Sequence, residues 1–228
     1  TFDVDGIELC FRDHRYFPPD HGPDSQPLMT ELVRQVREML RGLESERRKK
    51  LILGARVYQT LRECHSQGLD VSGWISSGLL DYVAPSDVMY ADFNAPYEEF
   101  VELARQTTEC LVYPGVLPWS SVRMRRRMGG QPMTPAQMRA LAQNFYGAGA
   151  DGVSFYNHFV PIKWAPSLPM MLFELEELGD PARIASSSKH YVFEPTWDGQ
   201  LGFGNGRTST GALKADKITL NRRHTPST

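Results

Sequence analysis

Strand-like and helix-like segments alternate along this 228-residue chain, and few folds accommodate that pattern. Each strand-like segment is rich in apolar residues, and each helix-like segment repeats its apolar residues at helical spacing. The predicted strands cover 5–14, 51–58, 81–85, 109–114 and 151–157. The predicted helices cover 28–43, 60–67, 96–105, 134–147 and 170–178, with 69–74 as a connector. Such alternation predicts a parallel sheet with helices outside it.

Two architectures fit this alternation, a doubly wound sheet and part of an eightfold barrel. The Gly-rich segment 202–206 has no surrounding strand–helix pattern, so it gives little support to a dinucleotide-binding fold. Polar residues instead gather where the predicted strands end, which is where barrel enzymes carry their chemistry. We therefore predict an α/β fold of the (β/α) TIM-barrel type over residues 1–188. Residues 189–228 lose the helical period and are predicted to form a β-strand extension or the start of an appended β-module.

The first predicted strand carries polar residues on one face only. Apolar and polar residues alternate along it, so a strand places the two kinds on opposite faces. A solvated edge strand would show this pattern, and so would a barrel strand whose apolar face packs on outer helices. In the barrel, Glu8, Cys10 and Arg12 point inward toward an active site.

Composition and charge exclude some classes of protein. The formal net charge is −2 and charged residues make up 23% of the chain, so no nucleic-acid partner is expected. No apolar run approaches the roughly 18 residues that a membrane span needs. The three cysteines, Cys10, Cys64 and Cys110, lack metal-ligand spacing and are expected to be reduced and mostly buried. We predict no metal or organic cofactor. No signal peptide is visible, but Thr1 opens directly onto a strand, so the native N-terminus is expected to be missing and no location is assigned.

The first strand, Asp5-Gly6-Ile7-Glu8-Leu9-Cys10-Phe11-Arg12, resembles the fourth-strand signature DGxDxDxE of chitinase-like glycoside hydrolases. Further segments resemble, in order, those of bacterial family-10-type glycosyl-hydrolase-like barrels. They are Gly68–Val71, Trp74-Ile75, Leu79–Asp81 and Gly149–Asn157. The resemblance spans residues 3–190 and implies a glycoside hydrolase-like protein that acts on a poly- or oligosaccharide.

Two positions depart from the chitinase-like signature. Where the signature has the acid that protonates the leaving group, this chain has Arg12, which cannot donate a proton at ordinary pH. Cys10 replaces the middle acid, so Glu8 is the one carboxylate left on that face. The chitinase mechanism therefore does not carry over. The alternative function is a non-catalytic glycan-binding or scaffold subunit that kept the barrel and lost the acid.

Three residues are predicted to carry catalysis. Glu8 would serve as nucleophile or acid–base group, with a structural ion pair to Arg56 as the alternative. Asp87 follows the third strand and would be the partner carboxylate, since glycosidases need two carboxylates about 5–9.5 Å apart. His14, just past the first strand, would exchange protons near neutral pH, with a solvated loop as the alternative. Asp81 is interpreted as a salt bridge low in the barrel.

Six residues near strand ends or on the polar strand face are predicted to bind substrate. They are Arg12, Arg56, Tyr58, Tyr113, Trp119 and Asn157. Arginine suits carboxylate, sulfate or hydroxyl groups, and aromatic rings stack on the apolar faces of sugars. A place in the core is the alternative for Trp119. The Arg123–Arg127 cluster is interpreted as a solvated loop, with recognition of an anionic glycan as the alternative.

The resemblance also implies that the chain begins at the fourth strand of the barrel, so that five β/α units are present. Open edges of an incomplete barrel favour association. We therefore predict a homo-oligomer, or a second chain that completes the barrel, besides a carbohydrate substrate; no membrane partner is expected. A barrel hydrolase of another bond, such as an amide, remains a third possibility because fold does not fix chemistry.

Overall fold

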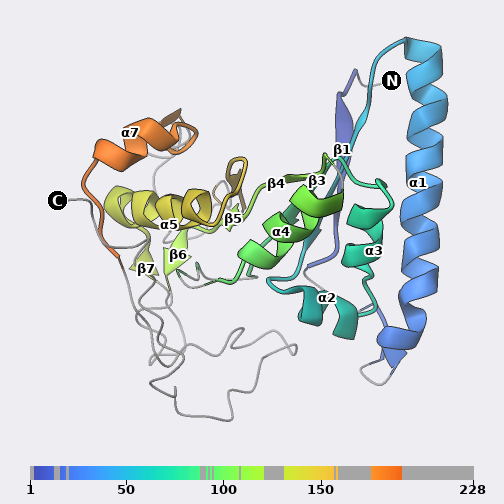
Figure 1. Cartoon of the computed structure of the whole chain (residues 1–228), viewed down its shortest axis with the longest axis horizontal. Helices are drawn as coiled ribbons and strands as arrows, with labels where there is room; N and C mark the ends of the chain where they lie inside the picture. Colours follow the sequence, from blue (N-terminus) through green and yellow to red (C-terminus); the bar gives the residue numbers. More distant parts are fainter. Residues whose placement is uncertain are drawn as a thin grey trace. The chain divides into compact units, whose positions relative to one another are not determined.

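The computed structural model describes residues 3–12, 16–18, 21–87, 91, 93, 95–107, 109–120, 131–156, 158 and 176–191. The chain divides into two compact units. The first unit holds residues 1–86 and 96–114, and the second holds residues 87–95 and 115–228. Figure 1 labels most of the helices and strands of both.

The first unit is built on a four-stranded parallel sheet. Its strands are β1 (Gly6–Cys10), β2 (Ile52–Val57), β3 (Tyr82–Pro85) and β4 (Leu111–Val112), which are neighbours in chain order. The register pairs Glu8 with Gly54 and Gly54 with Tyr82. The predicted α/β class with a parallel sheet is confirmed. The described strands form no closed barrel.

Helices connect the consecutive strands of this sheet. The short 3₁₀ helix η2 (Pro23–Ser25) and α1 (Gln26–Arg47) join β1 to β2, α2 (Leu61–Ser66) and α3 (Val71–Ser76) join β2 to β3, and α4 (Glu98–Thr107) joins β3 to β4. The connector predicted over 69–74 is wrong, because α3 begins there. The Asp70 side chain accepts a hydrogen bond from Gly73 N and so caps this helix.

One face of the sheet packs on these helices. Ala55 and Val57 of β2 are fully buried. The Phe11 ring lies 5.3 Å from the Trp74 ring of α3, and the Trp74 indole donates to the Thr30 hydroxyl of α1 at 2.8 Å. Helix α3 also contacts α4, so α1, α3 and α4 lie beside one another (Figure 1). The apolar set of the first strand therefore faces the helices, and its polar set lies on the opposite face.

The second unit holds short strand pairs in its described part. β5 (Gly115–Val116) pairs in parallel with β8 (Ser154–Phe155), and β6 (Trp119–Ser120) pairs antiparallel with β7 (Gln131–Pro132). Helix α5 (Pro135–Gly147) begins at the predicted cap, where the Thr134 side chain accepts from Gln137 N in a capping box.

Three predicted elements need correction. The fifth strand pairs with β5 instead of extending the four-stranded sheet. The fourth strand is shorter than predicted, and the last bond of its ladder runs from Tyr113 N to Val83 O at 2.9 Å. The helix predicted over 170–178 is not the last, because α7 (Pro181–Ser186) follows it with Asp180 as its N-cap. The β segment predicted over 189–228 lies outside the described residues from 192 onward.

Candidate functional site

The polar face of the parallel sheet carries a group of charged and aromatic side chains. We call it the sheet-face cluster, and it consists of Glu8, Arg56, Tyr82 and Tyr113. Arg56 donates from Nε to Glu8 Oε1 at 2.9 Å and from Nη2 to Glu8 Oε2 at 3.3 Å. The Tyr82 hydroxyl donates to the same Oε2 at 3.0 Å. The Tyr82 and Tyr113 rings meet edge to face, with their centroids 5.5 Å apart. The fold thus joins three residues predicted from the sequence and adds Tyr82.

The missing side chain at Gly54 lets Tyr82 reach Glu8. Gly54 stands between these two residues in the register. A Cβ at Gly54 would lie 2.0 Å from Cζ of Tyr82, so the ring crosses over this glycine. Glycine inside a strand often marks such a close approach. A glycine inside the predicted strand 51–58 was therefore the sequence signal for a large side chain on a neighbouring strand.

The contacts of the cluster fix the orientation of the Glu8 carboxylate. The Arg56 side chain is 5% exposed and the Glu8 side chain is 28% exposed. Burial, followed by the charge and hydrogen bond of Glu8, raises the pKa of Tyr82 well above its usual range. Tyr82 therefore remains a donor at neutral pH. A carboxylate has about four acceptor positions, and hydrogen bonds from the described residues fill three of them at Glu8.

Polar residues also lie where the strands of the first unit end. Arg12 lies two residues past the end of β1, and Tyr58 directly follows β2. Arg12 is 0% exposed, Tyr58 4% and Ser86 1%. The Ser86 hydroxyl has no hydrogen-bond partner among the described residues. Buried polar groups at the carboxyl ends of parallel strands are typical of binding sites in α/β proteins.

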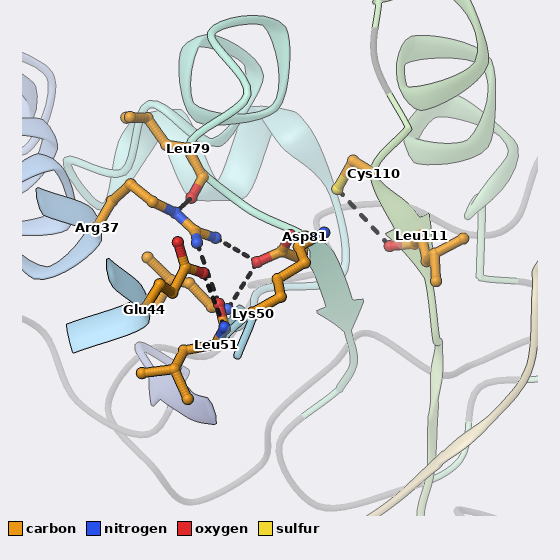
Figure 2. Close-up of polar contacts among 9 residues, drawn as sticks. Arg37, Glu44, Lys50, Leu51, Leu79, Asp81, Cys110 and Leu111 are labelled. Carbon is orange, nitrogen blue, oxygen red and sulfur yellow. Dashed lines mark hydrogen bonds and ion pairs between the residues drawn. The ribbon is translucent and has the colours of Figure 1, made fainter. Parts of the chain in front are cut away.

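A second charged network lies at the amino ends of β2 and β3 (Figure 2). We call it the Arg37 brace, and it consists of Arg37, Asp81 and Lys50. Arg37 of α1 donates to the Leu79 carbonyl at 2.9 Å and to the Leu51 carbonyl at 3.3 Å. It also pairs with Asp81. The brace therefore ties α1 to the segments that lead into both strands.

Asp81 is the centre of the Arg37 brace. Its carboxylate accepts from Leu53 N at 2.8 Å and pairs with Lys50 Nζ at 2.9 Å, besides Arg37. Burial alone would raise the pKa of Asp81, but the bonds from Leu53, Lys50 and Arg37 outweigh it and lower that pKa. The interpretation of Asp81 as a structural ion pair is confirmed.

Some predicted site residues fall elsewhere. His14 and Asn157 lie outside the described residues, as do the side chain of Trp119 and the cluster 123–127. Asp87 is buried and belongs to the second unit, whereas Glu8 belongs to the first, so their pairing stays a prediction.

The three cysteines are free, as predicted. Cys64 and Cys110 are buried, but Cys10 is exposed. The expectation of mostly buried cysteines therefore fails at Cys10, because its side chain lies on the polar face of a strand that ends the described sheet.

A scan against protein-family models and a search of curated proteins both find no match for this chain. Within the described residues, no three His, Cys, Asp or Glu side chains gather closely enough to hold a metal ion. The described helices include none that is long and apolar enough to cross a membrane. The function therefore rests on the site itself.

Proposed function

We propose that this chain is a carbohydrate-active protein of the glycoside-hydrolase type, which acts on a poly- or oligosaccharide. The observation that carries the proposal is the Glu8 carboxylate, oriented by Arg56 and Tyr82 and still 28% exposed. The sequential order of the parallel strands supports a barrel-type architecture, since a doubly wound sheet reverses its strand order.

The contacts of Glu8 favour the role of nucleophile over that of acid. A retaining glycosidase uses one carboxylate to attack the anomeric carbon while a second group protonates the departing oxygen. Arg56 and Tyr82 both donate to Glu8, which suits a group that must be negatively charged when it attacks. Asp87 and His14 are the candidates for the acid. In a retaining enzyme the second carboxyl group lies about 5–5.5 Å from the nucleophile.

Trapping and rescue at Glu8 test this role. The wild type and Glu8→Ala are assayed on nitrophenyl glycosides and polysaccharides, and we expect the variant to lose about 10³-fold or more in kcat/KM. Added azide should restore turnover by Glu8→Ala and yield a glycosyl azide, because the small anion replaces the carboxylate. Mass spectrometry should find a 2-fluoro sugar bound covalently to Glu8 of the wild type.

Glu31→Gln is the matched control. Glu31 lies on α1, and its half-exposed side chain pairs with Arg34. This variant should hydrolyse every substrate as the wild type does. Full activity of Glu8→Ala without azide would rule out the nucleophile role.

The alternative function is a glycan-binding subunit without catalysis. Arg12, at the position where the chitinase-like signature has its acid, favours it, because a guanidinium cannot protonate a leaving group. No turnover by the wild type on any substrate, together with equal glycan affinity of wild type and Glu8→Gln in calorimetry, would support this alternative.

Association with another chain is also proposed. β1 ends the described sheet, and Ile52 beside it is 41% exposed. On α1, Leu28 is 67% and Met39 54% exposed. An open parallel edge beside exposed apolar residues favours self-association or a second polypeptide. Light scattering should give a mass above that of one chain, and a monodisperse monomer would contradict the proposal.

A further inference from the structure

Helix α1 presents an exposed apolar strip on its outer side. Its buried residues, which lie on one side of the helix, are Met29, Val33, Arg37 and Leu40. On the outer side Leu28 is 67%, Leu32 45% and Met39 54% exposed. Single exposed apolar residues are ordinary on a protein surface, but these three follow one another at helical spacing. A continuous apolar strip of this kind indicates an interaction surface.

The exposed residues along this strip recur at alternating steps of four and three. We call them the α1 seam, and they are Leu28, Leu32, Gln35, Met39 and Gly42. Helices that pack along each other at a small angle show this spacing along their line of contact. Gly42 makes room in the seam, because a Cβ there would meet no other described segment within 4 Å. The seam therefore fits a helix that runs alongside α1.

A row of charges with alternating sign runs beside the α1 seam. We call it the charged flank, and it consists of Glu31, Arg34, Glu38 and Arg41, all exposed. Glu31 pairs with Arg34 within the helix, and the two side chains remain 50% and 48% exposed. Exposed pairs along one helix are weak, so these charges can also pair with those of another chain. Such a row also occurs on helices that face solvent, and its place beside an apolar seam is what gives it a further meaning.

The order of the charges fits an antiparallel second copy of α1. Two antiparallel helices related by a two-fold axis place their charged flanks on the same side of the contact. With the axis near Val36, Glu31 lies opposite Arg41 of the second copy, and Arg34 lies opposite Glu38 of the second copy. Every charge of the flank then meets an opposite charge.

The same register matches the α1 seam to itself. Leu32 lies opposite Met39 of the second copy, and Leu28 lies opposite Gly42, the position with room for a large side chain. A parallel pair lacks this match. It would set the charged flank of one copy against the other flank of the second copy, where Val36 lies at the same height.

We propose that two copies of this chain associate through α1, antiparallel and around a two-fold axis near Val36. A second copy is the occupant that the observations favour, because one axis makes both the α1 seam and the charged flank complementary to themselves. This inference rests on the association proposed above and specifies its surface and its partner. It does not depend on activity on glycans.

Reversal of charges on the charged flank tests the proposal. Glu31→Arg with Glu38→Arg makes the flank entirely positive, and Arg34→Glu with Arg41→Glu makes it entirely negative. Each double variant should self-associate about tenfold or more weakly than the wild type in analytical ultracentrifugation, because like charges then face each other. A mixture of the two double variants should associate as the wild type does. The control Glu176→Arg, which reverses an exposed charge of the second unit, should leave the association unchanged.

Single cysteines test the direction of the helices without reversing any charge. The background is Cys10→Ser, which removes the exposed native thiol. Gln35→Cys should form a disulfide with its own copy under mild oxidation, because it lies near the two-fold axis. Leu28→Cys should not do so, because two copies of this position lie about 20 Å apart along antiparallel helices. A mixture of Leu28→Cys and Gly42→Cys should instead form a disulfide between the two variants.

Three outcomes would overturn the proposal. A wild type that stays monomeric at every concentration would end both this inference and the association proposed above, and would leave the function on glycans untouched. An oligomer whose mass neither double variant changes would mean that another surface, such as the edge at β1, carries the association. A disulfide between two copies of Leu28→Cys, with none in the mixture with Gly42→Cys, would show a parallel pair.

Discussion

Among the arginine–carboxylate pairs of the first unit, the two that include a buried arginine serve different ends. In the Arg37 brace, Arg37 also bonds the backbone carbonyls of Leu79 and Leu51, and Asp81 accepts from a backbone amide. In the sheet-face cluster, Glu8 accepts from the side chains of Arg56 and Tyr82. Hydrogen bonds to the backbone join the brace to the segments that precede β2 and β3, whereas hydrogen bonds from side chains orient the Glu8 carboxylate.

Position on the sheet accounts for this difference. The brace lies at the amino ends of β2 and β3. In barrel proteins, residues at this end of the parallel strands contribute to stability. Glu8 lies on the face opposite the helices, and its side chain is 28% exposed against 19% for Asp81. A similar ion pair can therefore tie the backbone together or orient a partly exposed carboxylate, depending on what else each partner contacts.

Removing the carboxylate of the brace should have the largest effect on stability. Asp81→Ala leaves the Arg37 side chain, which is 6% exposed, without its anionic partner. We expect the free energy of unfolding to fall by about 3–5 kcal/mol in urea denaturation. Glu31→Ala, which breaks an exposed pair on α1, should change it by less than about 0.5 kcal/mol. Equal effects of the two substitutions would contradict the structural role of the brace.

A methyl group at Gly54 should have the next largest effect. Gly54→Ala forces the Tyr82 ring away from its place over the strand and breaks its bond to Glu8. We expect a loss of about 1–3 kcal/mol in the free energy of unfolding. The same substitution should cost much less in a Tyr82→Leu background, and a double-mutant cycle in urea measures the difference. Strict additivity would show that the ring does not cross Gly54.

Neutralising Glu8 should affect stability less than either change. In Glu8→Gln the amide oxygen still accepts from Arg56, and solvent reaches the side chain. We expect a loss of about 1 kcal/mol in the free energy of unfolding, whereas the proposed hydrolysis should be abolished. A loss as large as that of Asp81→Ala would mean that the sheet-face cluster is a second structural brace.

The smallest effect is a dependence on pH. The pKa of Asp81 is lower in the folded chain than its ordinary value of 3.8, so the folded state binds fewer protons. The ionised Asp81 carboxylate therefore stabilises the folded state fully at pH values above the ordinary pKa. This stabilisation is lost as the pH falls through the lowered pKa of the folded state. Urea denaturation of wild type and Asp81→Asn should show a difference at pH 7 that shrinks below pH 4. A constant difference would contradict this linkage.

Local patterns in the sequence were enough to predict several features. The alternation from Ile7 to Arg12 predicted which face of β1 meets the helices, and β2 and β3 pair in parallel as expected. The cap at Thr134 and the ion pair of Asp81 were also predicted. The strand alternation and the helix cap depend on residues that are close together in the chain. The ion pair of Asp81 was predictable because a carboxylate next to a buried strand needs a cationic partner.

Other features depended on the tertiary structure. Tyr82 joins Glu8 only because the register sets it opposite Gly54, and register is a contact between distant segments. The pairing of β5 with β8, and the hydrogen bond between the His158 ring and the Val116 carbonyl, also join residues far apart in the chain. Sequence patterns predict which face a side chain occupies. Only the packed strands decide which side chains meet, because hydrogen bonds and ring contacts require atoms within a few ångströms of each other.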